Sequence, residues 1–160
     1  MSDVKEYYDE VPYFSAAFSD CSPVRIHAIA RFLGLNPPAP EEARVLEFGC
    51  SYGGNILPFT AHNERADVVG IDISSTQVSV GNKIAKDMGI GNFSLMELDI
   101  VKLDESEAKR LGKFDYIIAH GVYSWVDDSV KEALLRSVKL LLSANGVAYI
   151  SYNIYPGWKS

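Results

Sequence analysis

The hydrophobic positions of the chain fall into two alternating patterns. Short, nearly continuous apolar runs are typical of strands buried on both faces of a sheet. These runs occupy residues 45–48, 67–72, 92–98, 114–119 and 147–152. The segments between them carry apolar residues three or four positions apart, as amphipathic helices do, or are short and charged, as at 102–112. Strands that alternate with helices predict an α/β fold, a doubly wound parallel sheet of five strands with right-handed crossovers and helices on both faces.

Two helix starts have the spacing of a capping box, in which a serine and a residue three positions later bond each other's backbone. Ser74 with Gln77 and Ser129 with Glu132 have this spacing. A third helix is expected at residues 55–62, directly after the first strand and the loop that follows it.

The stretch that organises the chain is that loop, GCSYGGN, at residues 49–55. In an open parallel sheet, ligands bind at the carboxyl ends of the strands, where glycines let the backbone approach the ligand and a helix begins. Glu47 departs from the dinucleotide-binding version of this loop, because a carboxylate at the strand end would repel a pyrophosphate. It would favour a cationic ligand such as S-adenosylmethionine, which carries a sulfonium and an ammonium group. The loop therefore favours methyl transfer over hydride transfer.

Two other functions stay open on the residues alone. Gly49, Ser51 and Gly54 have the G-x-G-x-x-G spacing of a dinucleotide-dependent oxidoreductase, with Ser51 in place of the second glycine. Glu47 and Asp99 count against that interpretation. The remaining alternative is a non-catalytic module that keeps the fold and binds a cofactor or a partner.

Length and composition narrow the class of protein. The chain has 160 residues, the size of one domain, and its formal net charge of −6 argues against a nucleic-acid partner. No apolar run approaches the ~20 residues that span a bilayer, and the acidic start does not resemble a secretory signal, so we expect a cytoplasmic protein without a membrane partner. Cys21 and Cys50 are too few for a disulfide framework and lack metal-ligand spacing, so we expect reduced thiols and no metal site.

The chain resembles the class I S-adenosylmethionine-dependent methyltransferases, whose domain is Rossmann-like. The resemblance rests on an acidic first strand end, the glycines of the loop and the carboxylates after two further strands, namely Glu47, Gly49, Gly53, Gly54, Asp72 and Asp99. A narrower resemblance, to bacterial methyltransferases with a C-terminal regulatory domain, rests on the segments YYDEVPY, GGNILP, HGVYSWV and SYNIYPGW. Some relatives of that group methylate protein lysines. The resemblance thus implies a protein, such as one methylated at lysine, or a small molecule as methyl acceptor.

The resemblance also implies a site for the cofactor S-adenosyl-L-methionine. Its residues are expected to be Glu47, Gly49, Cys50, Ser51, Gly53, Asn55, Asp72, Ile73, Gln77, Asp99, Ile100 and His120. Within this set, Glu47 would lie near the ammonium of the cofactor. Asp72 would accept hydrogen bonds from the ribose hydroxyls and Asp99 from the adenine amino group.

Catalysis is expected to depend on alignment, because methyl transfer is an in-line displacement at a carbon that the sulfonium already activates. His120, Tyr123 and Tyr155 are the candidates for positioning the acceptor amine. Trp125 is expected to pack beneath the rim of the pocket.

The resemblance finally predicts a sheet with further strands after the fifth. Residues 1–160 are therefore expected to be one methyltransferase domain, with an irregular arm at 1–21, from the N-terminal part of a longer protein. The fifth strand is then an open edge that could pair with a second copy and form a homodimer.

Overall fold

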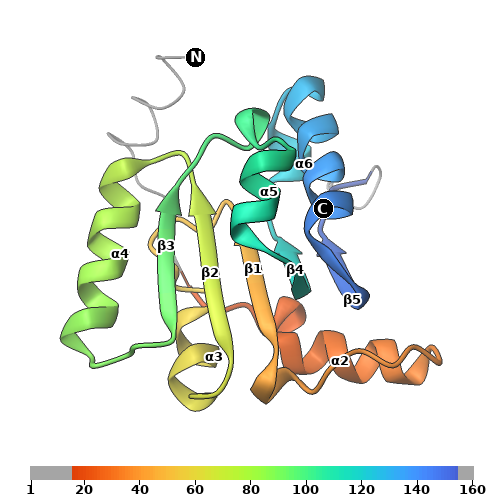
Figure 1. Cartoon of the computed structure of the whole chain (residues 1–160), viewed down its shortest axis with the longest axis horizontal. Coiled ribbons are helices and arrows are strands. Elements are labelled where there is room, and N and C mark those ends of the chain that lie inside the picture. Colours follow the sequence, from red (N-terminus) through yellow and green to blue (C-terminus); the bar gives the residue numbers. More distant parts are fainter. Residues whose placement is uncertain (1–15, 155–160) are drawn as a thin grey trace.

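The computed structural model describes residues 16–154, which form a sheet of five parallel strands (Figure 1). The strands are β1 (Arg44–Phe48), β2 (Asp67–Asp72), β3 (Phe93–Glu97), β4 (Phe114–Ala119) and β5 (Leu142–Ile150). Their order across the sheet is β3-β2-β1-β4-β5, so the direction of winding reverses between β1 and β4. In open α/β sheets the ligand crevice lies at such a reversal. The predicted doubly wound parallel sheet is confirmed.

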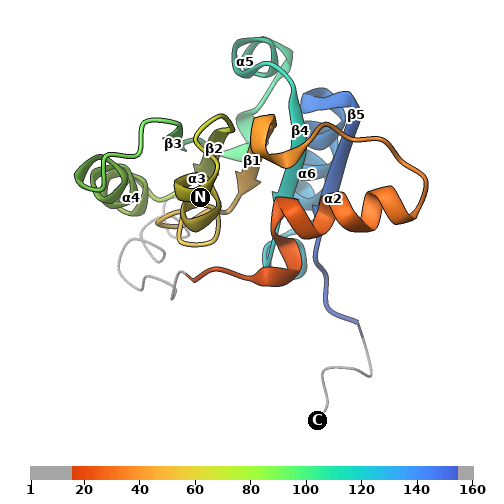
Figure 2. The ribbon, with the colours of Figure 1, turned by 90° about the horizontal axis from the view of Figure 1, so that it is seen from below.

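Helices cover both faces of this sheet (Figures 1 and 2). They are α2 (Pro23–Phe32), α3 (Leu57–His62), α4 (Ser75–Asp87), α5 (Glu105–Leu111) and α6 (Asp128–Leu141), with short 3-10 helices η1 (Ser19–Cys21), η2 (Pro40–Glu42), η3 (Ile100–Lys102) and η4 (Tyr123–Trp125). Successive side chains of β1 point to opposite faces. Val45 belongs to the buried cluster shared with α2, α3 and α4, and Leu46 to the cluster shared with α5 and α6.

The helix starts agree with the sequence in one case and differ in two. Ser74 caps α4 as predicted, since its Oγ accepts a hydrogen bond from the Gln77 N–H at 3.2 Å. The capping box predicted at Ser129 and Glu132 is wrong, because α6 already begins at Asp128 and Ser129 lies inside its first turn. The third helix, α3, begins at Leu57 rather than at residue 55, because the glycine loop continues as turns to residue 56.

The boundary between α6 and β5 also differs from the prediction. β5 spans Leu142–Ile150 instead of 147–152, so it follows α6 directly. Leu142 already pairs with Phe114 of β4, and the register then shifts so that Val147 pairs with Tyr116. The strand thus begins early and accommodates extra residues in a bulge.

The two outer strands, β3 and β5, each pair on one side only within residues 16–154. The homodimer through β5 stays a prediction. The predicted arm is described only from residue 16 onwards, and the last segment of the resemblance only up to residue 154, so Tyr155 lies outside the described residues. No helix in this described range is both long and apolar enough to cross a membrane.

Candidate functional site

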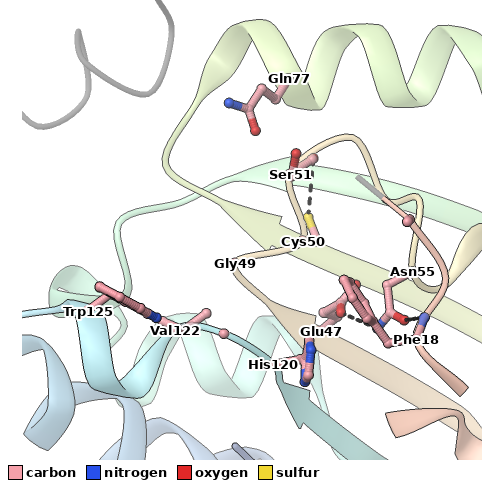
Figure 3. A pocket seen from close by; sticks show the side chains of 12 residues that line it. Phe18, Glu47, Gly49, Cys50, Ser51, Asn55, Gln77, His120, Val122 and Trp125 are labelled. Carbon is pink, nitrogen blue, oxygen red and sulfur yellow. Dashed lines mark hydrogen bonds between the residues drawn. The ribbon is translucent and has the colours of Figure 1, made fainter. Parts of the chain in front are cut away.

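Two cavities meet at the carboxyl ends of the strands. The first has a volume of about 420 Å³ and the second of about 180 Å³. Gly49, in the loop after β1, and Val122, after β4, line both of them. The two cavities are therefore neighbours, with Gly49 and Val122 between them. Figure 3 shows the residues around the first cavity.

The loop after β1 turns through left-handed backbone, with φ of +69° at Gly49, +52° at Ser51 and +77° at Gly53. There is also no room for a side chain at Gly49, since a Cβ there would lie 2.5 Å from Cγ2 of Val122. At Gly53 a Cβ would lie 2.5 Å from the ring of Phe93. Gly53 therefore allows the loop to pack on β3, and it does not line either cavity.

Asp72 braces this loop from the end of β2. Its Oδ2 accepts a hydrogen bond from the Ser51 N–H at 2.8 Å, and its Oδ1 accepts one from the Ser74 N–H at 3.0 Å. The first bond holds Ser51 in a backbone conformation that a serine rarely adopts. Each carboxylate oxygen has a second lone pair, so Asp72 can still accept hydrogen bonds from a ligand in the second cavity, which it lines.

Glu47 is the buried carboxylate of the first cavity, with only 3% of its surface exposed. Its Oε1 accepts a hydrogen bond from Asn55 Nδ2 at 2.6 Å, whereas its Oε2 has no partner among the described residues. Burial raises the pKa of Glu47 to about 8; the Asn55 bond acts in the opposite direction and the Asp72 charge in the same one. A cation bound at Oε2 would supply the missing partner and favour the ionised carboxylate.

The second cavity combines apolar walls with two carboxylates, those of Asp72 and Asp99. Its apolar residues are Phe48, Ile71, Ile73, Leu98, Ile100, Val122, Val126 and Val130. Asp99 Oδ1 accepts a hydrogen bond from the Val101 N–H at 3.0 Å, which caps η3 and fixes the carboxylate. A flat apolar group with hydrogen-bond donors at its edges would fit this chemistry.

His120 follows β4 directly and lines the first cavity. Its ring centroid lies 4.5 Å from that of Phe18 and 6.2 Å from that of Tyr149, and its Nδ1 has no hydrogen-bond partner within residues 16–154. Burial lowers the pKa of His120, and the charge of Asp20 partly opposes this. A neutral imidazole with an unpartnered ring nitrogen can accept a proton or a hydrogen bond.

The structure gathers most of the predicted site residues around the two cavities. Glu47, Gly49, Cys50, Ser51, Asn55, Gln77 and His120 line the first, and Gly49, Asp72, Ile73, Asp99 and Ile100 line the second. Tyr123 lines neither; its ring packs on the apolar cluster of the α5 and α6 face, with the Lys131 Nζ 6.0 Å from the ring centre. What these residues do toward a ligand stays a prediction. Among the described side chains, no group of three His, Cys, Asp or Glu could hold a metal ion.

The expectation that Trp125 packs beneath the rim is wrong, because Trp125 is 59% exposed and lines the first cavity. Residues three apart lie on the same side of a 3-10 helix. Val122 and Trp125 are therefore both turned toward the cavity at η4, while Tyr123 is turned to the core. That spacing is a signal the sequence interpretation overlooked. It also overlooked Ala16 and Phe18, which reach the first cavity from the N-terminal segment.

Comparisons with known proteins agree with this arrangement. A family model described as a methyltransferase domain matches residues 46–148. The solved structure of PKMT2 from Rickettsia typhi in complex with AdoHcy is similar at 44% identity and a TM-score of 0.85, over 92% of this chain and 28% of that chain. An uncharacterised protein of Rickettsia prowazekii is 45% identical over 94% of this chain and 59% of its own length. A ubiquinone biosynthesis O-methyltransferase of Acinetobacter baumannii is 25% identical over 68% of this chain and 43% of its own length.

This chain thus spans less than two thirds of the length of each of these relatives. The family model, by contrast, covers more than half of the chain. The chain belongs to the methyltransferase domain family.

Proposed function

We propose that this chain is the cofactor-binding part of an S-adenosylmethionine-dependent methyltransferase. The observation that carries the proposal is the buried carboxylate of Glu47, whose Oε2 lacks a partner beside the first cavity. An unpaired buried charge is unfavourable unless a counter-charge meets it. The ammonium of the cofactor would be that counter-charge. The similar PKMT2 structure, which holds AdoHcy (S-adenosylhomocysteine), supports the same ligand class.

The two neighbouring cavities suit the two ends of this cofactor. The first cavity, with Glu47 and the loop at Gly49, suits the methionine end. The second cavity would take the adenosine, with Asp72 accepting from the ribose hydroxyls, Asp99 from the adenine amino group, and apolar side chains against the ring. When bound, S-adenosylmethionine supplies a methyl group that its sulfonium activates for transfer. The protein's own contribution is to orient, to exclude water and to receive a proton.

A dinucleotide suits the loop less well. Such a loop binds a pyrophosphate through backbone N–H groups, but the Ser51 N–H already donates to Asp72 Oδ2. The Asp72 carboxylate stands beside the loop and would repel the phosphates, and the buried Glu47 next to it offers no positive charge to balance them. This arrangement favours the methyltransferase over the oxidoreductase.

The acceptor we propose is an amine on a protein, such as a lysine side chain. The name of the similar PKMT2 denotes a protein-lysine methyltransferase, and that relative is 44% identical to this chain. Phe18 and Trp125 put aromatic rings on the first cavity, and His120 offers an unpartnered Nδ1 there. Aromatic faces attract an ammonium, and a neutral imidazole could take the proton that an amine must lose before it attacks.

The test is a parallel calorimetric titration of the chain with S-adenosylhomocysteine and with NAD. We expect saturable heat for S-adenosylhomocysteine and none for NAD at the same concentrations. Binding of NAD alone would support the oxidoreductase instead. Binding of neither ligand would leave the non-catalytic module as the better description.

A further inference from the structure

A short N-terminal segment forms one wall of the first cavity. We call residues 16–21, which include η1, the strap. Ala16 and Phe18 of the strap line the first cavity, and Phe18 lies against His120 (Figure 3). On its other side the strap borders an open groove between α2 and α3, where Phe18 and Cys21 are again lining residues. The strap is therefore open to solvent on this side up to Cys21, which is buried in the core.

One side chain, Asn55, ties the strap to the buried carboxylate. Asn55 Oδ1 accepts a hydrogen bond from the Phe18 N–H at 2.9 Å, and Asn55 Nδ2 donates one to Glu47 Oε1 at 2.6 Å. Because a backbone N–H can only donate, the atom facing Phe18 must be the amide oxygen. The amide nitrogen is then left for Glu47. The orientation of the Asn55 side chain is fixed by these two partners.

The Cys21 thiol lies against the same amide, with its Sγ 3.3 Å from Asn55 Nδ2 and 3.6 Å from Oδ1. Two residues of the strap, Phe18 and Cys21, thus contact Asn55. Cys21 is also fully buried in the hydrophobic core, so packing anchors this end of the strap, whereas residues 17–20 are exposed and the ion pair of Asp20 with Arg25 is exposed at both side chains. Asn55 is the link through which the strap reaches the ligand-binding carboxylate.

The bond to Asn55 also decides which carboxylate oxygen faces the cavity. Oε1 is taken by the amide, so Oε2 is the oxygen left for a ligand. A hydrogen bond to an ionised carboxylate is stronger than one to a neutral carboxyl. Hydrogen bonds in series polarise one another, so a stronger bond at Nδ2 strengthens the bond that Oδ1 accepts from the strap.

Building on the proposed function, we propose that Asn55 is a positioning residue that couples closure of the strap to occupancy of Glu47. A ligand cation at Oε2 keeps Glu47 ionised, the ionised carboxylate holds Asn55, and Asn55 holds the strap with the Phe18 ring against His120. Such coupling is reciprocal, so a loosened strap must weaken cofactor binding by the same factor. The strap is then held more firmly over the reacting end of the cavity when the cofactor is in place.

The test uses amide hydrogen exchange in the strap of the whole chain, with and without saturating S-adenosylhomocysteine. In the wild type, the ligand should slow exchange at residues 16–21. In Asn55→Leu this slowing should vanish, and the calorimetric affinity should fall about 10- to 100-fold, the range for a hydrogen bond to a charged group. The control is Asn145→Leu, an exposed asparagine of β5, which should behave as the wild type. Equal slowing in Asn55→Leu and in the wild type would overturn the proposal.

A second arm needs neither the ligand nor the Asn55 variant. Amide exchange in the strap, corrected for the intrinsic rate, is measured below and above the pH at which Glu47 ionises. The measurement is made in the wild type and in Glu47→Gln. The titratable groups around Glu47 are Asp72, Cys21, Cys50 and His120. Protection should rise with pH in the wild type and stay level in Glu47→Gln. The same rise in both proteins would refute the coupling, even if S-adenosylhomocysteine failed to bind and the proposed function fell.

Discussion

At the scale of single residues, two carboxylates that look alike in the sequence have different surroundings. Asp72 has a backbone N–H on each of its oxygens and so stabilises the loop and the start of α4. Glu47 is buried with one oxygen unpartnered, which brings the fold no stability. Buried polar groups without a partner are expected mainly at functional sites. The unfavourable burial of Glu47 is the reason to place the ligand cation there.

The burial of Glu47 predicts a particular dependence of stability on pH. The pKa of Glu47 is about 8 in the folded protein, whereas the ordinary value for a glutamate is 4.5, so between these values the folded protein keeps a proton that the unfolded chain has lost. The free energy of unfolding should therefore decrease as pH rises through this window, by about 1.4 kcal/mol for each unit of pKa difference. The side chain in Glu47→Gln cannot ionise. The free energy of unfolding of this variant, relative to that of the wild type, should therefore increase with pH.

Urea unfolding of both proteins from about pH 5 to about pH 8 measures this growth. The control is Glu64→Gln, an exposed glutamate, which should parallel the wild type at every pH. An advantage of Glu47→Gln that does not change with pH would show that Glu47 is already ionised in the folded protein.

At the scale of elements, the glycine loop, α4 and β3 are packed together around Leu95. A Cβ on Gly81 of α4 would lie 2.4 Å from Leu95 Cδ1 and 2.5 Å from the Tyr52 carbonyl oxygen in the loop. Asn82 exchanges two hydrogen bonds with the backbone of Leu95, as a neighbouring strand would. The outer strand β3 is thus partly covered by a helix side chain.

Gly81→Ala should therefore destabilise the protein, although alanine is normally favoured over glycine inside a helix by up to about 1 kcal/mol. The clash with the Tyr52 carbonyl should outweigh that gain and lower the free energy of unfolding by about 1 to 3 kcal/mol. The control is Gly91→Ala, where a Cβ would meet open space. If urea unfolding finds Gly81→Ala as stable as the wild type, α4 is not packed on the loop as closely as described.

The sequence predicted some elements to the residue and others poorly, for physical reasons. The strand 67–72 begins and ends with an aspartate, the strand 114–119 lies between Lys113 and His120, and both agree with β2 and β4. The end of α6 could not be found, because the apolar run of residues 140–142 continues from the helix into β5 without a break. There the strand begins where β4 offers a pairing partner, which is a tertiary effect.

At the scale of the whole molecule, the site is built where the winding of the sheet reverses. The sheet order sets β1 beside β4, so the loop after β1 and the segment after β4 line the same cavities. Carboxylates at strand ends could be placed from the sequence, because parallel strands end at one edge. The contact of Phe18 with Asn55, 37 residues apart, could not be, since it depends on how the N-terminal segment crosses the finished fold.

The central claim, that Glu47 holds the ammonium of the cofactor, is tested most directly by changing the protein and the ligand together. Wild type and Glu47→Gln are each titrated with S-adenosylhomocysteine and with its analogue that lacks the amino group. Removing the amino group should weaken binding to the wild type by about 10- to 100-fold, the range for a charge-assisted hydrogen bond, and should change binding to Glu47→Gln far less. An equal loss of affinity in both proteins would contradict the account, because the ammonium would then be held elsewhere.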